Sequence, residues 1–215
     1  MTRRHRLRLW AEFLLLFVVT PAVVAVALPP RWMFPVLFAF TAVGIALLQF
    51  TPGFRWSSLL SGIGRISARR VLAVAVLTAV ASVAVMAWRQ PDGLFAILRT
   101  RPWLMLMIAL FYPIVSALPQ ELVFRVLFFR RYGPILPGGR MAIWLNAAVF
   151  ALAHLMYWSG IVIAFTFVGG LLFAWSYERR RNFPEAVVLH AVAGDILFAF
   201  GLGVYFYSGN VVRPF

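Results

Sequence analysis

The chain has 215 residues, 63% of them hydrophobic and 12% charged, with a mean hydropathy of +0.91, and this composition excludes a soluble domain with a polar surface. Its net charge of +14 comes from arginines distributed between apolar runs, which argues against a nucleic-acid interface and indicates membrane topology. The absence of cysteine excludes disulfides, thiolate metal sites and a cysteine nucleophile.

Seven apolar segments are long enough to cross a hydrocarbon core as helices, which takes about 20 residues. They are residues 10–28, 32–50, 71–88, 103–129, 141–158, 161–177 and 184–207. The first follows a basic N-terminus but lacks a small-residue cleavage site, so we expect it to be retained as a helix. The sequence thus predicts an all-α, polytopic membrane bundle.

The fourth segment is too long for one straight crossing, and Pro113 and Pro119 offer places for a kink or a break. Seven and eight transmembrane helices are therefore both compatible with the sequence. Residues 50–70 contain Pro52, Gly53 and further glycines, and they suit a loop with a short interfacial helix.

Arginine positions predict the orientation, because positive residues in short loops favour the cytoplasmic side. With the N-terminus inside, fourteen arginines fall on the cytoplasmic side and five on the other, and Arg125 is set aside as intramembrane. The five are Arg31, Arg89, Arg99, Arg101 and Arg213. We therefore expect a cytoplasmic N-terminus. We also expect a single integral membrane domain, 1–215, with scaffold helices in 1–101 and the chemistry in 102–215.

Three ionisable side chains, Glu121, His154 and His190, lie inside apolar segments. Such groups are costly in hydrocarbon, so each is a candidate functional residue. Arg125 follows Glu121 by four residues, which places both on one face of a helix, and Asp195 follows His190 by five. The other acids, Glu12, Asp92, Glu178 and Glu185, lie near predicted helix ends, where solvation explains them.

These residues allow several interpretations. Glu121 and Arg125 could be a buried ion pair that joins two helices, and a histidine in a membrane helix is often an interhelical hydrogen-bonding residue. A carboxylate with imidazoles in a dry cavity could instead activate water for hydrolysis. The same set could bind a divalent metal such as zinc, although no HExxH motif is present. A proton relay in a small transporter is a further option, but no inverted repeat supports it.

Three motifs in order resemble those of the CPBP family of intramembrane proteases, also called the Abi or CaaX-protease family. The family pattern is EExxxR on one membrane helix, FxxxH on the next, and a later HxxxN or HxxxD. The chain has QELVFR at 120–125, FALAH at 150–154 and HAVAGD at 190–195. The resemblance covers the part of the chain from Trp103 onward. The QE pair and the third motif are similar to those of a bacterial subgroup whose members are classed as proteases.

The resemblance implies a glutamic-type hydrolase. A glutamate and the first histidine, here Glu121 and His154, would activate water. The second histidine and the polar residue after it, here His190 and Asp195, would stabilise the oxyanion. Arg125 would orient the acidic group, with Gln120 and Phe150 in supporting positions.

Two positions depart from the family pattern. Gln120 stands where the family has its first glutamate, and an amide cannot act as a base, so either Glu121 takes that role or proteolysis has been lost. Gly194 stands at the fourth position of the third motif, so Asp195 is rotated by about 100° unless a local bulge brings it back.

We therefore expect an intramembrane endopeptidase of a bacterial inner membrane that cuts a membrane-associated or lipid-modified protein. The expected partners are this substrate and the lipid bilayer, with no nucleic acid. We expect no cofactor, and a zinc ion remains an open alternative. The alternative function is a catalytically inactive scaffold, immunity factor or partner-binding protein with the same fold.

Overall fold

The computed structural model describes residues 1–214, which form a bundle of helices with no strand in that range. Six helical stretches are long and apolar enough to cross a membrane: Arg3–Ala27, Pro30–Gln49, Ala68–Arg89, Pro102–Arg131, Arg140–Tyr157 and Gly160–Arg180. The predicted all-α polytopic bundle is confirmed, and the chain is a multi-pass membrane protein.

The seventh predicted segment forms α11, Phe183–Ala199, which has 17 residues. At about 1.5 Å per residue it is about 26 Å long, close to the thickness of a hydrocarbon core. It ends before the predicted boundary at 207. Gly201 has a φ of 97°, and the chain continues as a 3-10 turn, η10, Leu202–Tyr205. The sequence therefore predicted the C-terminal end of this helix too far along the chain.

The fourth predicted segment is one continuous helix, so it is not divided into two spans. It consists of α6 (Pro102–Tyr112), η6 (Pro113–Ala117), α7 (Leu118–Glu121), η7 (Leu122–Leu127) and α8 (Phe128–Arg131). The η6 and η7 segments are π-helical. Proline removes a backbone donor, and local rewinding of this kind accommodates it without breaking the helix.

The remaining elements surround this helix. They are α1 (Arg3–Leu14), η1 (Leu15–Val19), α2 (Thr20–Ala27), η2 (Pro30–Trp32), α3 (Met33–Gln49), η3 (Trp56–Leu60), η4 (Ile63–Arg65), α4 (Ala68–Arg89), η5 (Pro91–Gly93), α5 (Ala96–Thr100), η8 (Gly133–Ile135), α9 (Arg140–Ala153), η9 (Leu155–Tyr157), α10 (Gly160–Arg180) and η11 (Ser208–Asn210). The expected loop at 50–70 therefore carries two short 3-10 turns, and both contact α11. The side chains of Ser67, Ser159 and Asn182 each accept a hydrogen bond from the backbone N–H of the third residue of α4, α10 and α11, respectively.

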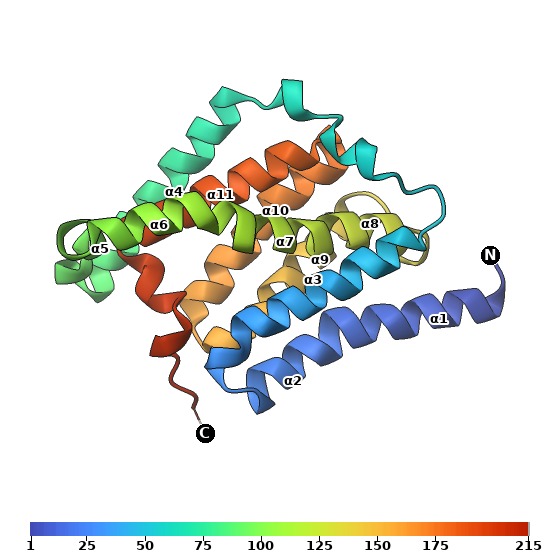
Figure 1. Cartoon of the computed structure of the whole chain (residues 1–215), viewed down its shortest axis with the longest axis horizontal. Helices are drawn as coiled ribbons and strands as arrows, with labels where there is room; N and C mark the ends of the chain where they lie inside the picture. The colour runs from blue at the N-terminus through green and yellow to red at the C-terminus, as the bar shows by residue number, and fades with distance from the viewer. Residues whose placement is uncertain (215) are drawn as a thin grey trace.

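The second half of the fourth span is the centre of the bundle. All six residues of η7 are buried, and the segment contacts α3, α9 and α10. The rings of Phe124 and Phe128 each lie 5.6 Å from the ring of Phe17. Figure 1 shows α6 to α8 crossing the middle of the molecule, with α3 on one side and α11 on the other. Residues of η7 are therefore held from several directions.

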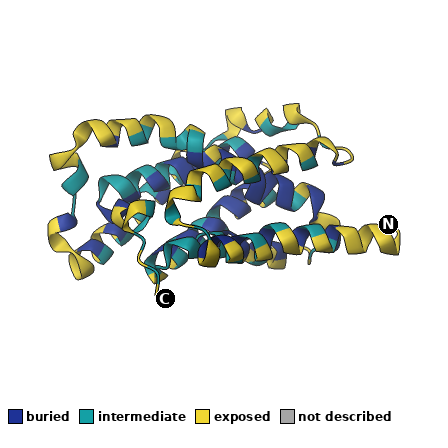
Figure 2. Ribbon diagram, turned by 60° about the horizontal axis from the view of Figure 1, so that its bottom comes forward, coloured by how far each residue is buried: buried dark blue, intermediate teal, exposed yellow. Residues whose placement is uncertain are grey.

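The outer faces of the helices carry large apolar side chains, as a lipid-facing surface requires. On α4, for example, Leu72, Leu77 and Val80 are each exposed over more than 60% of their surface. Figure 2 shows the buried residues concentrated between the helices and the exposed ones along their outer sides.

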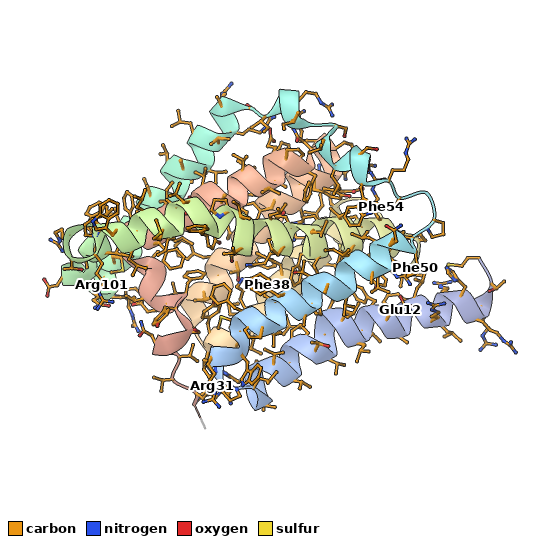
Figure 3. All side chains as sticks on the ribbon, viewed as in Figure 1. Glu12, Arg31, Phe38, Phe50, Phe54 and Arg101 are labelled. Atoms are coloured by element: carbon orange, nitrogen blue, oxygen red, sulfur yellow. The ribbon has the colours of Figure 1, made fainter. Side chains whose placement is uncertain are left out.

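Charged groups collect at one end of the bundle. Arg131 makes an ion pair of 2.7 Å with Glu12, and its Nη1 donates to the carbonyl oxygen of Leu47. Figure 3 shows Glu12, Phe50 and Phe54 at this end and Arg101 at the other. The two sets of loops predicted to face opposite sides of the membrane thus lie at opposite ends of the helices.

Candidate active site

Glu121 and His190 form the centre of the site. Nδ1 of His190 lies 2.9 Å from Oε1 of Glu121, although the two residues are 69 positions apart in the sequence. The other carboxylate oxygen of Glu121 lies 3.1 Å from Nε of Arg125. The side chains of Glu121 and Arg125 are fully buried. One oxygen of the carboxylate therefore has a hydrogen-bond partner, and the other lies beside a positive charge, which offsets part of the cost of burying it.

Arg125 is also held by Asn146 of α9, which the sequence analysis missed. Nη1 of Arg125 donates a hydrogen bond of 2.5 Å to Oδ1 of Asn146, whose Nδ2 donates to the carbonyl oxygen of Phe124. The guanidinium lies over the ring of Phe150, 4.6 Å from its centre. Asn146, Phe150 and His154 are spaced by four and share a helix face. A lone amide on the face of the FxxxH motif was the signal that could have identified it.

The imidazole of His190 is fixed by two aromatic rings. It is stacked on Phe173 at 4.8 Å, with an interplanar angle of 11°. The ring of Phe150 meets it edge-on at 5.6 Å. Because a carboxylate only accepts hydrogen bonds, Nδ1 of His190 carries the proton donated to Glu121, and Nε2 of the neutral ring keeps its lone pair.

His154 lies immediately after the end of α9 and is followed by the 3-10 turn η9. Its Nδ1 is 2.7 Å from the carbonyl oxygen of Phe150. That oxygen can only accept, so Nδ1 donates and Nε2 again keeps a lone pair. Its ring centre is 4.7 Å from that of Phe150, which also contacts His190. The two histidines therefore contact the same phenylalanine ring.

A cavity of about 990 Å³ opens in front of these histidines. Residues from α4, α6, α10 and α11 line it, and Gln120, Phe150, His154 and His190 form part of its wall. A smaller cavity of about 110 Å³, between α2 and α3, also has Gln120 and His154 in its wall. Glu121 is not among the described residues that line either cavity. Its carboxylate lies behind the wall and contacts His190, which lines the large cavity.

The third motif presents Gly194 to the cavity. Helix α11 is regular from Phe183–Ala199, so it has no bulge that would rotate Asp195 toward the histidines. Gly194 lines the cavity, whereas Asp195 is not among the described lining residues. Oδ1 of Asp195 is buried and has no hydrogen-bond partner among the residues described.

The π-helical segment η7 begins directly after Glu121 and contains Arg125. Segments of this kind recur at functional sites, where they alter the direction of side chains within a continuous helix. Here the residues on both sides of the change belong to one ion pair of 3.1 Å. The first motif is therefore placed on a locally rewound part of the central helix.

A zinc site with catalytic geometry takes at least three protein ligands. Within residues 1–214, no group of three or more histidine, aspartate or glutamate side chains is arranged to hold a metal ion. The carboxylate of Glu121 is shared between His190 and Arg125.

Glu185 was expected to be solvated at a helix end, and this expectation was wrong. Its side chain is fully buried and forms two bonds with Arg70, of 2.8 and 2.7 Å. The backbone N–H of Ser67 and the hydroxyl of Ser176 also donate to it, each at 3.0 Å. This cluster joins the start of α4 to the start of α11, the helix that carries His190.

Comparison with known protein families adds an independent observation. Residues 101–194 match the family model described as type II CAAX prenyl endopeptidase Rce1-like. The resemblance to the CPBP family is confirmed over this segment. The Rce1-like segment contains the first two motifs and His190, and it ends at Gly194, one residue before Asp195. No curated protein and no solved structure gave a significant match to the chain.

Proposed function

We propose that this protein is an intramembrane endopeptidase that hydrolyses a peptide bond in a membrane-associated or lipid-modified protein. The observation that carries the proposal is the pair formed by Glu121 and His190 at the wall of a large cavity, with Nε2 of His190 left to take a proton. A histidine oriented by a buried carboxylate is a recurring arrangement for general base catalysis. The Rce1-like match supports proteolysis as the reaction class.

In the proposed mechanism, His190 takes a proton from water as the water oxygen attacks the scissile carbonyl carbon. Glu121 stabilises the imidazolium that forms, and it does not need to enter the cavity to do so. Arg125 and Asn146 hold the carboxylate in place from behind. Collapse of the tetrahedral intermediate breaks the C–N bond, and His190 returns the proton to the leaving amine.

His154 would orient the attacking water. Its Nδ1 is engaged by the Phe150 carbonyl, so Nε2 can accept a hydrogen bond from water in the cavity. Water held by two imidazole acceptors has its oxygen lone pairs free for attack. This assignment gives the water-activating work to the two histidines, with Glu121 supporting one of them.

The surroundings suit a substrate drawn from the membrane. The cavity wall is mainly apolar, with side chains such as Leu104, Met107 and Leu197. Apolar chain from a membrane-embedded substrate can therefore enter without losing favourable contacts. The arginine distribution supports a cytoplasmic N-terminus, and a bacterial inner membrane remains the proposed location.

One observation favours the alternative of an inactive scaffold. Gln120, in the place of the family's first glutamate, is the residue of the QE pair that reaches the cavity, while Glu121 is buried behind it. If the reaction requires a carboxylate in contact with water, this chain lacks one at that position.

The experiment compares membrane and secreted peptide termini from cells that express wild type or His190→Gln. This variant is preferred to Glu121→Gln because it leaves Glu121 paired with Arg125, so no buried charge loses its only partner. A control variant, Trp88→Phe, alters an exposed side chain on the outer surface.

A new terminus present with wild type and Trp88→Phe, and absent with His190→Gln at equal protein level, supports the proposal. Identical termini from all three, with the deletion phenotype still complemented by His190→Gln, would establish the inactive scaffold instead.

A further inference from the structure

Tyr112 occupies the space where the third motif has lost a side chain. Gly194 follows His190 by four residues on α11, so both face the same side of the helix. A Cβ atom at Gly194 would lie 2.2 Å from Cε1 and 2.5 Å from the hydroxyl oxygen of Tyr112. The ring of Tyr112, on α6, is 6.0 Å from that of His190, and both line the large cavity. The phenol hydroxyl therefore lies beside Gly194, which is one turn of α11 away from His190.

The two histidines leave the cavity short of hydrogen-bond donors. Both Nδ1–H groups point away from it, toward Glu121 and toward the Phe150 carbonyl. Neutral imidazoles held in this way present only acceptor atoms to the cavity. Hydrolysis of a peptide bond needs donors aimed at the oxyanion that develops on the carbonyl oxygen. A donor therefore has to come from another group at the cavity wall.

Tyr112 is the first of a row of three polar side chains on the fourth span. Tyr112, Ser116 and Gln120 are spaced by four, and all three line the cavity. Nε2 of Gln120 donates a hydrogen bond of 2.9 Å to the hydroxyl oxygen of Ser116. Ser116 follows Tyr112 by four residues and lines the same cavity. Because Ser116 already accepts from Gln120, its own proton can turn toward the oxygen of Tyr112, and the proton of Tyr112 is then left for the cavity.

Gln120 sets the direction of this row. With Nε2 of Gln120 as the donor to Ser116, the hydroxyl protons of Ser116 and Tyr112 can both be directed toward the cavity. A carboxylate at position 120 would accept the proton of Ser116, and Ser116 would then accept from Tyr112 in place of the substrate. The glutamine that replaces the family's first glutamate would thus orient the hydroxyl groups of Ser116 and Tyr112.

We propose that the hydroxyl of Tyr112 donates a hydrogen bond to the oxyanion at the scissile carbonyl, an assignment that rests on the proposed hydrolase function. As the water oxygen bonds to the carbonyl carbon, its proton passes to Nε2 of His190 and the C=O electron pair moves onto the carbonyl oxygen. Tyr112 hydrogen-bonds that oxygen without giving up its proton. When the C=O bond re-forms, the C–N bond breaks and the amine takes the proton from His190.

The test uses the purified full chain in lipid nanodiscs and a peptide that spans the cleavage site found by the comparison of termini. Tyr112→Phe removes one oxygen atom and keeps the ring that contacts Gly194 and Phe198. We expect kcat to fall about 10²- to 10³-fold, the usual loss of one oxyanion donor, with KM unchanged. A phosphinic analogue of the same peptide, which mimics the tetrahedral intermediate, should bind the variant weaker by a similar factor.

Two further variants separate catalysis from packing. Tyr132→Phe makes the same change at a tyrosine that is buried outside the cavity, and it should leave kcat unchanged. Gln120→Glu should lower kcat about as much as Tyr112→Phe, because it reverses the row. Tyr112→Phe that cleaves as wild type does, or Gln120→Glu that cleaves faster, overturns the assignment to Tyr112 while the proposed function stands. A wild-type protein that does not cleave overturns the proposed function and this inference with it.

Discussion

Glu121 joins His190 to Arg125: one of its oxygens lies 2.9 Å from Nδ1 of His190 and the other 3.1 Å from Nε of Arg125. The three side chains come from two helices that lie far apart in sequence. The carboxylate therefore orients a histidine at the cavity wall and neutralises a buried guanidinium at the same time. Changes at Glu121 should affect stability as well as activity.

Glu121→Gln should destabilise the folded protein by about 3–5 kcal/mol, because it leaves Arg125 charged and buried without an opposite charge. Glu121→Gln combined with Arg125→Met should recover much of this loss, since both charges are then removed. The measurement is thermal unfolding in detergent of the two single variants and the double variant. Strictly additive losses would contradict the coupling.

Asn146→Ala should cost about 1–3 kcal/mol, because it leaves a guanidinium N–H and the Phe124 carbonyl oxygen without partners. Cleavage should slow as well, since Arg125 and then Glu121 lose support. Asn146→Gln at the same position tests whether an amide one carbon longer can restore either property. Unchanged unfolding of Asn146→Ala, measured in the same detergent, would show that Arg125 does not depend on α9.

In the cluster around Glu185, substitutions of the two charged residues should lower the stability by different amounts. Glu185 is fully buried, whereas the side chain of Arg70 is 29% exposed. Arg70→Ala leaves an unpaired buried carboxylate and should cost about 3 kcal/mol or more. Glu185→Gln leaves an arginine that can reach water, and its amide can still accept a bond, so it should cost less. Equal losses of thermal stability in detergent would contradict this account.

Gly194→Ala should displace the ring of Tyr112, because the added Cβ would lie 2.2 Å from one of its carbon atoms. Overpacking of this size costs about 1–3 kcal/mol, so the protein should still fold. The rate at which Gly194→Ala cleaves the substrate peptide should be lower than that of wild type, as is expected for Tyr112→Phe. Gly160→Ala is a suitable control, since its new methyl would meet nothing within 4 Å and the residue does not line the cavity. A Gly194→Ala protein with full activity would place Tyr112 outside the reaction.

The orientation can be tested cleanly because the chain has no cysteine. Ser57→Cys and Asp92→Cys each introduce a single thiol at an exposed position, one before the start of α4 and the other after its end. With a cytoplasmic N-terminus, a membrane-impermeant maleimide applied to intact spheroplasts should label the cysteine at position 92 and not the one at position 57. The reverse pattern would invert the proposed topology.

Much of the architecture followed from the sequence. The long apolar runs predicted membrane spans, because hydrocarbon leaves the backbone no other hydrogen-bonding partner than its own helix. Of the motif residues, Gln120, Phe150, His154 and His190 line the large cavity, whereas Glu121 and Asp195 do not. The Rce1-like family model matches residues 101–194. The sequence left open whether the fourth segment is one helix or two, since a proline in a membrane helix is compatible with a break, a kink or a π-helical turn. In the structure it is one continuous helix with two π-helical segments.

The sequence by itself determined that the chain lies in a membrane, that it is helical, and which ionisable residues stand among apolar ones, since each of these depends on local composition and spacing. Only the tertiary structure decided that Glu121 lies behind His190, that Asn146 holds Arg125, and that Tyr112 fills the space beside Gly194. These relationships depend on the rotation and depth of helices packed side by side. Helical periodicity fixes which residues share a face, but only packing against the neighbouring helices fixes what that face meets.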